Sequence, residues 1–359
     1  FTRLEYSPLV LQWRYLTAEH IHLAWWRGGD GIEAVDWLAL AMVLVGIIVG
    51  LILLVQSVRT PSDAATEGSI RHTVYTIGLG LIALALLTYY QMTMADPEMT
   101  LVAQRIQAES QRGDAVLFLQ PERTQAFANA YRGHEPVYGF FGANELNESD
   151  AAWLAQIQGT YARLWVAPDY RPADQSAWER TLRTEDFLLQ DDRISGPSDQ
   201  RLSLYALAPA QNLTEFGLGT VFGDPHAEAP VTADNGWFRL AGYALPASVQ
   251  PGDALALSLL WESLQPVDYN YQVFVHFLDR DGNKVAQRDG QPVQWLRPTS
   301  TWQAGERIVD HYGLLLPDST PTGRYTIAVG LYDPVTGQRL PVSAGPSSYA
   351  IELGPVDVQ

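Results

Sequence analysis

The sequence predicts a membrane-anchored multidomain protein with two transmembrane α-helices, a small α/β domain and a C-terminal β-sandwich. Three observations support this fold class. Two long uncharged runs lie near the N-terminus, helix and strand patterns alternate over residues 95–209, and short alternating strands separated by turns fill residues 210–359. A chain of 359 residues is long enough for several domains, because single hydrophobic cores stop growing at roughly 250–300 residues.

The two uncharged runs, residues 37–55 and 74–92, each have the length of a membrane-spanning helix. Each contains 19 residues, and at about 1.5 Å per residue such a helix nearly crosses a hydrocarbon layer of about 30 Å. The connecting loop carries Arg59 and Arg71, whereas the outer flanks are acidic. The positive-inside rule therefore predicts a two-span protein of the cell membrane, in contact with membrane lipid, with a short cytoplasmic loop and the bulk of the chain extracytoplasmic.

Residues 1–36 precede the predicted membrane region (37–94) and are rich in aromatic side chains. They are compatible with a helix lying along the membrane surface or with the end of an earlier transmembrane region. The chain starts at Phe1, without Met or a signal-peptide pattern. We therefore expect that an N-terminal segment was removed or that the sequence is part of a longer polypeptide.

Residues 95–209 have the pattern of a small extracytoplasmic α/β domain. Helical periodicity predicts helices at 99–111, 122–131, 151–158 and 174–184, and apolar runs predict strands at 115–119, 161–167 and 201–207. Strands that alternate with helices of about ten residues are typical of a layered α/β domain.

Residues 210–359 are predicted as a linker and an immunoglobulin-like β-sandwich. The first part, 210–236, reads as a linker or first edge strand, and alternation predicts strands at 254–261, 269–279, 307–316, 325–333 and 348–353. The segment 321–325 ends in Tyr325 and predicts a tyrosine corner, in which the hydroxyl binds nearby backbone.

Charge and cysteine content exclude several classes of function. The net charge is −17, and residues 95–359 hold 33 of the 40 acidic but only 18 of the 23 basic residues. Nucleic-acid binding requires clustered cations, so nucleic acid is excluded as a partner. The chain has no cysteine, which excludes disulfides, thiolate metal sites and a cysteine nucleophile.

Three aromatic residues of the predicted sandwich, Trp295, Trp302 and Tyr312, are candidates for contact with a glycan or a partner protein. An aromatic face packs well on a pyranose ring. The alternative, which we favour for these side chains, is that they belong to the sandwich core or pack between domains.

Other motifs do not assign catalytic, cofactor or metal residues. The segment 279–283 resembles the start of a calcium loop, but position 12 is Gly290, so a hairpin turn explains it better. A histidine–aspartate pair from His276 and residues 310–311 lacks a nucleophile context. His20 and His22 lack a third metal ligand.

Several segments resemble the C-terminal part of bacterial membrane glycosyltransferases of the GT-C superfamily, which are protein-mannosyltransferase-like. The matching segments are 102–106, 112–116, 161–167 and 202–205, and in a sandwich module of Chloroflexota-type bacteria 273–278, 302–306, 317–325, 329–333 and 336–341. The resemblance implies enzymes that use polyprenyl-phosphate sugars. GT-C enzymes carry their catalytic acid on an early extracytoplasmic loop that this sequence lacks, so no catalytic residue is carried over.

Three hypotheses of function follow. The first is a non-catalytic extracytoplasmic portion or relative of such a glycosyltransferase, which assists glycan or acceptor handling. The second is an accessory subunit that docks its two helices against a larger membrane protein complex, favoured by the lack of a catalytic constellation. The third is a surface carbohydrate-binding module.

Overall fold

The computed structural model describes residues 2–4, 96–119, 123–139, 146, 148–167, 176–194, 200–208, 212–343 and 349–359. The chain separates into two compact units: residues 1–4, 105–121 and 133–359 form one, and residues 5–104 and 122–132 form the other. In the second unit, the Arg123 guanidinium binds the Asp96 carboxylate at 2.6–2.7 Å and the Glu98 carboxylate at 2.8 Å. These ion pairs join the residue that precedes helix α6 (Thr124–Ala130) to the start of helix α5 (Pro97–Glu109).

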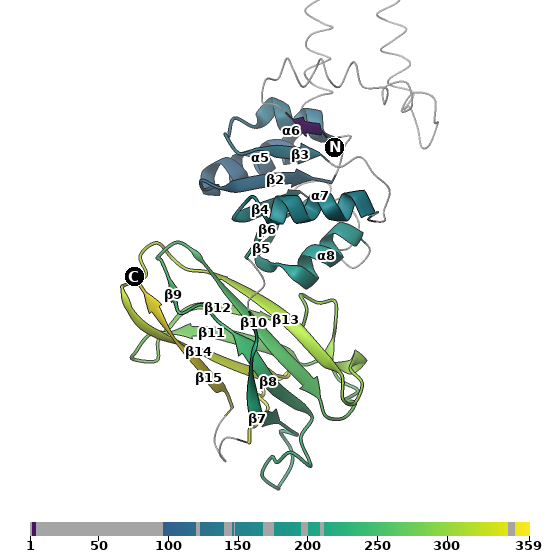
Figure 1. Ribbon diagram of the computed structural model, residues 1–359, viewed down its shortest axis with the longest axis vertical. Helices are drawn as coiled ribbons and strands as arrows, with labels where there is room; N and C mark the ends of the chain where they lie inside the picture. Colours follow the sequence, from purple (N-terminus) through teal and green to yellow (C-terminus); the bar gives the residue numbers. More distant parts are fainter. Residues whose placement is uncertain are drawn as a thin grey trace, which may run out of the picture. The chain divides into compact units, whose positions relative to one another are not determined.

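A six-stranded mixed sheet forms the α/β layer of the first unit (Figure 1). Its strands, in spatial order, are β1 (Thr2–Leu4), β3 (Val137–Gly139), β2 (Asp114–Phe118), β4 (Arg163–Ala167), β6 (Gln200–Ala206) and β5 (Phe187–Ile194). The pairs β3–β2 and β2–β4 are parallel, whereas β1, β6 and β5 pair antiparallel with their neighbours. The central strands are buried along their whole length, which is typical of a sheet covered on its faces.

The described helices are α5 (Pro97–Glu109), α6 (Thr124–Ala130), α7 (Glu148–Gln158) and α8 (Ala177–Glu185). Leu154 and Ile157 of α7 and Trp178 and Leu182 of α8 join one hydrophobic cluster with side chains of β2, β4, β5 and β6. Ser176 caps α8, because its hydroxyl accepts the Glu179 backbone N–H at 3.4 Å. The apolar stripe of α8 therefore lies on the sheet.

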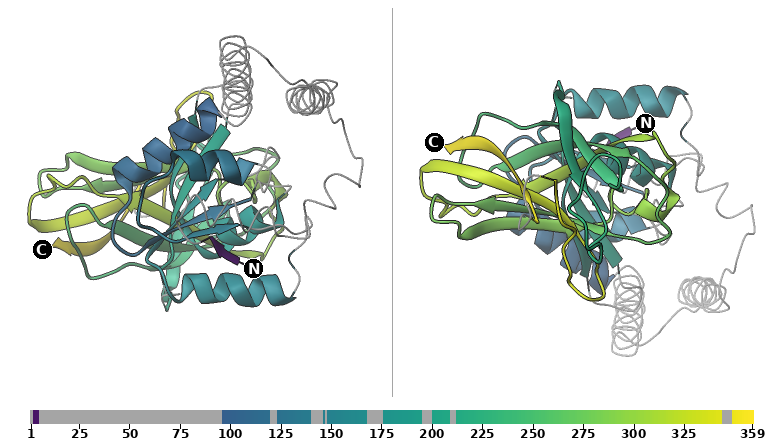
Figure 2. Two further views of the ribbon diagram at one scale, coloured as in Figure 1. Left: turned by 90° about the horizontal axis from the view of Figure 1, so that it is seen from above. Right: turned by 90° about the horizontal axis from the view of Figure 1, so that it is seen from below.

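Residues 212–359 form a β-sandwich of two antiparallel-rich sheets, visible from two further directions in Figure 2. The four-stranded sheet has the order β13 (Arg307–Leu315), β10 (Ala254–Ser263), β8 (Phe238–Ala244) and β7 (Thr214–Phe222). The five-stranded sheet has the order β12 (Lys284–Gly290), β11 (Gln272–Leu278), β14 (Gly323–Tyr332), β15 (Ile351–Val358) and β9 (Ser248–Val249). A short 3-10 helix, η2 (Thr299–Thr301), precedes β13.

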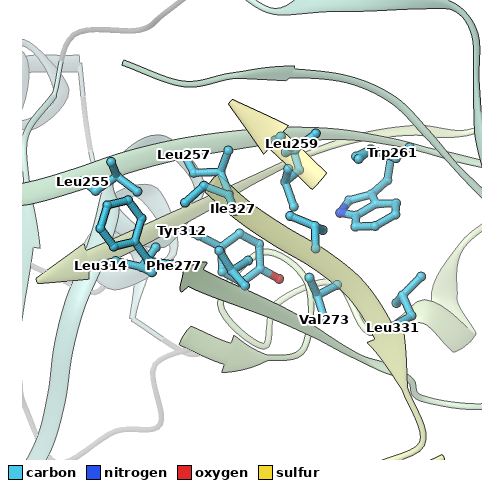
Figure 3. Close-up of a cluster of buried hydrophobic side chains, with 14 of the residues drawn as sticks. Leu255, Leu257, Leu259, Trp261, Val273, Phe277, Tyr312, Leu314, Ile327 and Leu331 are labelled. Atoms are coloured by element: carbon cyan, nitrogen blue, oxygen red, sulfur yellow. The ribbon is translucent and has the colours of Figure 1, made fainter. Parts of the chain in front are cut away.

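The core of the sandwich consists of the alternate side chains that face inward from both sheets (Figure 3). Leu255, Leu257, Leu259 and Trp261 of β10 share this core with inward residues of β11, β13 and β14. Each of these large apolar side chains contributes about 1.5–3 kcal/mol through burial. The predicted tyrosine corner is confirmed, because the Tyr325 hydroxyl donates to the Pro321 carbonyl at 2.7 Å.

The predicted membrane-anchored fold class is corrected by the structure. The described residues are mostly β-sheet, and none of the described helices is long and apolar enough to cross a membrane. The longest, α5, has 13 residues and rises only about 20 Å, against a hydrocarbon layer of about 30 Å. The described residues therefore do not support the predicted two-span placement in the cell membrane. The predicted spans, 37–55 and 74–92, and the segment 5–36 lie outside the described residues.

Candidate functional site

The candidate site is a loop, residues 291–298, that connects β12 to η2 and is called the Trp295 loop below. Its Trp295 side chain is 53% exposed, and it is the single tryptophan among the exposed large apolar residues of the described chain. An exposed indole costs free energy of solvation, since most of its surface is apolar. Its exposure therefore points to a role other than packing.

The backbone of this loop is strained at three consecutive residues. Val293, Gln294 and Trp295 have φ values of 52°, 53° and 76°, in the left-handed region that residues other than glycine rarely adopt. Each such residue costs on the order of 1–3 kcal/mol and persists only where the surroundings hold it. Clustered strain of this kind is a feature of functional sites.

Backbone hydrogen bonds close the strained turn. The Trp295 amide donates to the Gln291 carbonyl at 3.2 Å, the Leu296 amide to Val293 at 3.0 Å and the Arg297 amide to Pro292 at 3.2 Å. These bonds alone do not explain three left-handed residues, because ordinary turns satisfy the same groups without strain. The additional stabilisation comes from side chains outside the loop.

The first of these side chains is Asp310 of β13, which lies inside the sandwich core. Its Oδ1 accepts the Val293 backbone N–H at 2.7 Å. Burial raises the Asp310 pKa to about 7, against the opposing influence of the Tyr312 hydroxyl, the Val293 amide and the Trp261 indole. Neither side-chain donor reaches full hydrogen-bond geometry with Oδ2, so they stabilise the carboxylate only in part and burial dominates.

The second is Arg183 of α8, which belongs to the α/β layer. Its Nη1 donates to the Gln294 carbonyl at 3.0 Å, and its Nη2 binds Asp191 of β5 at 2.7 Å. The Ser203 hydroxyl donates to the other Asp191 oxygen at 2.8 Å. Burial alone would raise the Asp191 pKa, but Arg183 overrides burial and the net pKa is lowered. The Gln294 side-chain amide adds a further anchor by donating to the His311 carbonyl.

The region next to the loop is a close junction between β5 and β13. The Phe187 and His311 rings meet edge to face at 4.9 Å between centroids. The Arg288 Nη1 of β12 donates to the Leu189 carbonyl at 2.7 Å. A Cβ added at Gly313 would lie 2.9 Å from the Leu188 carbonyl oxygen, so only glycine permits this approach. This junction is separate from the contacts that hold the Trp295 loop, which come from Asp310 of β13 and Arg183 of α8.

The structure places the three predicted contact residues at different depths. Trp295 is exposed, whereas Trp302 and Tyr312 are only 0% and 3% exposed and belong to the sandwich core. These two therefore present no face to a glycan, in agreement with the core alternative. Both nevertheless contribute to the site, because the Trp302 indole donates to the Arg297 carbonyl at 2.9 Å and Tyr312 lies beside Asp310.

The side chains of the histidine–aspartate pair considered in the sequence have partners other than one another. His276 Nε2 lies 3.8 Å from Asp289, and burial, followed by Lys284 and Arg339, lowers its pKa to about 4. His311 faces away from the core, and its Nδ1 is 2.8 Å from the Ser258 hydroxyl. Burial lowers its pKa to about 4 as well. Both imidazoles are therefore neutral at neutral pH.

The remaining motifs have structural explanations or lie elsewhere. Asp279 Oδ1 accepts the backbone N–H groups of Asp281 and Asn283 at 2.9 and 2.8 Å, as expected for a hairpin turn. His20 and His22 lie outside the described residues. The sequence pattern did not indicate that Arg183 and Asp310 hold the loop. No local signal marks them, because the Arg183 contact joins residues 111 positions apart.

Comparison with known proteins assigns no family. No family model matches the chain, and no curated protein matches it. Solved structures that align with part of the chain include a CARDB domain from Pyrococcus furiosus in complex with di-metal ions, at 15% identity and a TM-score of 0.22, over 33% of this chain and 84% of that one. The C-terminal domain of Wzt matches at 13% identity and a TM-score of 0.25, over 42% and 79%.

A Niemann-Pick type C2 protein from the Japanese carpenter ant matches at 8% identity and a TM-score of 0.22, over 41% of this chain and 99% of that one. At these scores the likenesses assign neither a family nor a function. None of these three is a GT-C glycosyltransferase, so the expectation of a glycosyltransferase-like membrane protein gains no support from them and its membrane part is corrected above.

Proposed function

We propose that the β-sandwich binds a saccharide without catalysing a reaction, and that the Trp295 indole is its stacking platform. The observation that carries the proposal is an exposed tryptophan held on a strained loop by buried side chains. The resemblance to the C-terminal part of GT-C enzymes, which handle sugars, remains a prediction.

The chemistry of an indole suits a sugar. Its flat apolar face packs against the C–H face of a pyranose ring, while its N–H group can donate a hydrogen bond to water or to a hydroxyl group. A platform that is already fixed loses little conformational entropy when the ligand arrives, which improves affinity. The supports from Asp310 and Arg183 provide this fixation.

Hydrogen-bonding groups for sugar hydroxyls occur in the same loop and just before β13. Arg297 forms an ion pair with Glu306, and their side chains are 40% and 29% exposed. This pair lowers the Glu306 pKa, so the carboxylate is an acceptor at neutral pH. A guanidinium donor and a carboxylate acceptor side by side match the mixed donor and acceptor character of hydroxyl groups.

The test is a glycan array probed with the full chain, the Trp295→Ala variant and a matched Tyr349→Ala variant. Tyr349 is also an exposed aromatic residue, at 47%, but it lies on another segment. We expect wild-type and Tyr349→Ala protein to bind the same saccharides, and Trp295→Ala to bind them at least ten-fold more weakly. An array without binding, or binding that Trp295→Ala leaves unchanged, would refute the proposal.

A further inference from the structure

We propose that Arg183, a residue of the α/β layer, is a positioning residue for the Trp295 platform of the sandwich. The inference rests on the proposed saccharide binding for its functional consequence. Its structural content can be tested separately, because it predicts where the Trp295 ring lies even without a ligand.

The contact acts on the one peptide unit that sets the direction of Trp295. The Gln294 carbonyl, which accepts from Arg183 at 3.0 Å, and the Trp295 amide, which donates to Gln291 at 3.2 Å, belong to the same planar group. Holding both ends of this plane restricts the φ angle of Trp295, which is 76°. Without the Arg183 guanidinium, this peptide group would keep only the hydrogen bond from the Trp295 amide to Gln291.

Arg183 is itself held rigidly, so it can transmit position. It is 2% exposed, and its second nitrogen binds Asp191, which in turn accepts the Ser203 hydroxyl at 2.8 Å. These groups come from α8, β5 and β6, three elements of one packed layer. A charged donor that is buried and paired forms stronger and more directional hydrogen bonds than an exposed one.

The same region supplies matched controls. Arg288 joins the sandwich to the α/β layer through the Leu189 carbonyl at 2.7 Å. Arg201 forms a cluster of charges with Glu179, Arg183 and Asp191, and its ion pair is with Glu179. Replacement of either residue weakens the junction or the cluster, but leaves the hydrogen bond to the Gln294 carbonyl in place. These variants therefore show whether a change at Trp295 results from general loss of packing or from loss of the Arg183 hydrogen bond to Gln294.

The experiment uses the full chain labelled with 5-fluorotryptophan, in which the Trp295→Phe variant assigns the Trp295 fluorine resonance. We expect Arg183→Gln to shift or broaden this resonance. Arg183→Lys should produce a smaller change, because a lysine ammonium group keeps the charge but replaces only some of the guanidinium donors. Arg288→Gln and Arg201→Gln should leave it in place. If Arg183→Gln disturbs all tryptophan resonances, Arg183→Lys carries the test.

The proposal is overturned if the Trp295 resonance of the folded Arg183 variants matches that of wild type, or if Arg288→Gln moves it equally. For a saccharide identified on the array, we expect Arg183→Gln to weaken binding about ten-fold and Arg288→Gln to leave it unchanged. If no saccharide binds wild-type protein, the proposed function fails while the fluorine spectra still decide the positioning role.

Discussion

The Asp310 carboxylate in the sandwich core accepts a 2.7 Å hydrogen bond from the backbone amide of Val293, the first of three left-handed residues. A charged or polar group in an apolar core is costly unless it has a partner. Here that partner is the strained loop. The buried Asp310 carboxyl therefore helps to hold the loop that carries the exposed Trp295.

Replacement of Asp310 by Asn should change how stability depends on pH. The folded-state pKa of about 7 lies above the ordinary value of 3.8, so the folded state retains its proton while the unfolded chain ionises. The wild type therefore loses stability as pH rises from about 4 to 7, by at most about 4 kcal/mol from this group. Asn retains the acceptor for Val293 without titrating.

Urea unfolding at pH 5 and pH 8 checks this expectation. The stability of Asp310→Asn relative to wild type should rise between the two pH values, whereas Asp281→Asn, at an exposed carboxylate, should show no such trend. An Asp310→Asn difference that is independent of pH would show that the buried carboxyl does not titrate in this range.

Because Trp295 has a positive φ, its replacement by glycine should destabilise the protein less than its replacement by alanine. Glycine adopts a φ of 76° without steric cost, whereas alanine does not. We therefore expect Trp295→Gly to be more stable than Trp295→Ala by about 1 kcal/mol. At Val309, an exposed position of strand β13, glycine should instead be the less stable replacement. A Trp295→Gly variant less stable than Trp295→Ala would argue against a strained loop.

The close approach of β13 and β5 depends on Gly313. A Cβ at this position would lie 2.7 Å from Leu189 Cδ2 and 2.9 and 3.1 Å from two carbonyl oxygens. Gly313→Ala should cost about 1–3 kcal/mol in thermal or urea unfolding. Gly159→Ala is the matched control, since its Cβ would meet nothing nearer than 3.4 Å. Equal effects at the two sites would contradict the junction described above.

The Tyr325 hydroxyl should make its own contribution to stability, in addition to that of the ring. Tyr325→Phe removes the 2.7 Å hydrogen bond to the Pro321 carbonyl but retains the stacked contact with Phe277, at 4.6 Å between ring centroids. We expect a loss of about 1 kcal/mol in the free energy of unfolding. Tyr325→Ala should lose considerably more, because the stacked ring also disappears. A Phe variant as stable as wild type would show that solvent replaces the bond.

Strong local patterns made much of the sandwich predictable from the sequence. The alternation over 254–261 corresponds to β10, and the aromatic residue after a turn identified the Tyr325 corner. Strand β5 was missed, because its sequence FLLQDDRI is apolar only in its first half. The membrane prediction rested on two uncharged runs, and the described helices are too short to support it.

The site was predictable only in part. Trp295 could be named as an aromatic candidate. The left-handed turn could not be predicted, because Val293, Gln294 and Trp295 are not the glycine or asparagine residues that usually mark such turns. The supports come from Asp310 and Arg183, and such contacts between distant strands and helices leave no local pattern in one sequence. Burial of Trp302 and Tyr312 likewise follows from the packing of the sandwich core rather than from composition.

Stacking of a saccharide on Trp295 can be detected by a fluorine titration. The 5-fluorotryptophan-labelled full chain, which has 11 tryptophans, is titrated with a saccharide selected on the array. We expect the Trp295 resonance to move in a saturable manner while that of the buried Trp302 stays in place. A saturable shift at other tryptophans with Trp295 unchanged, or no saturable shift at all, would contradict this expectation.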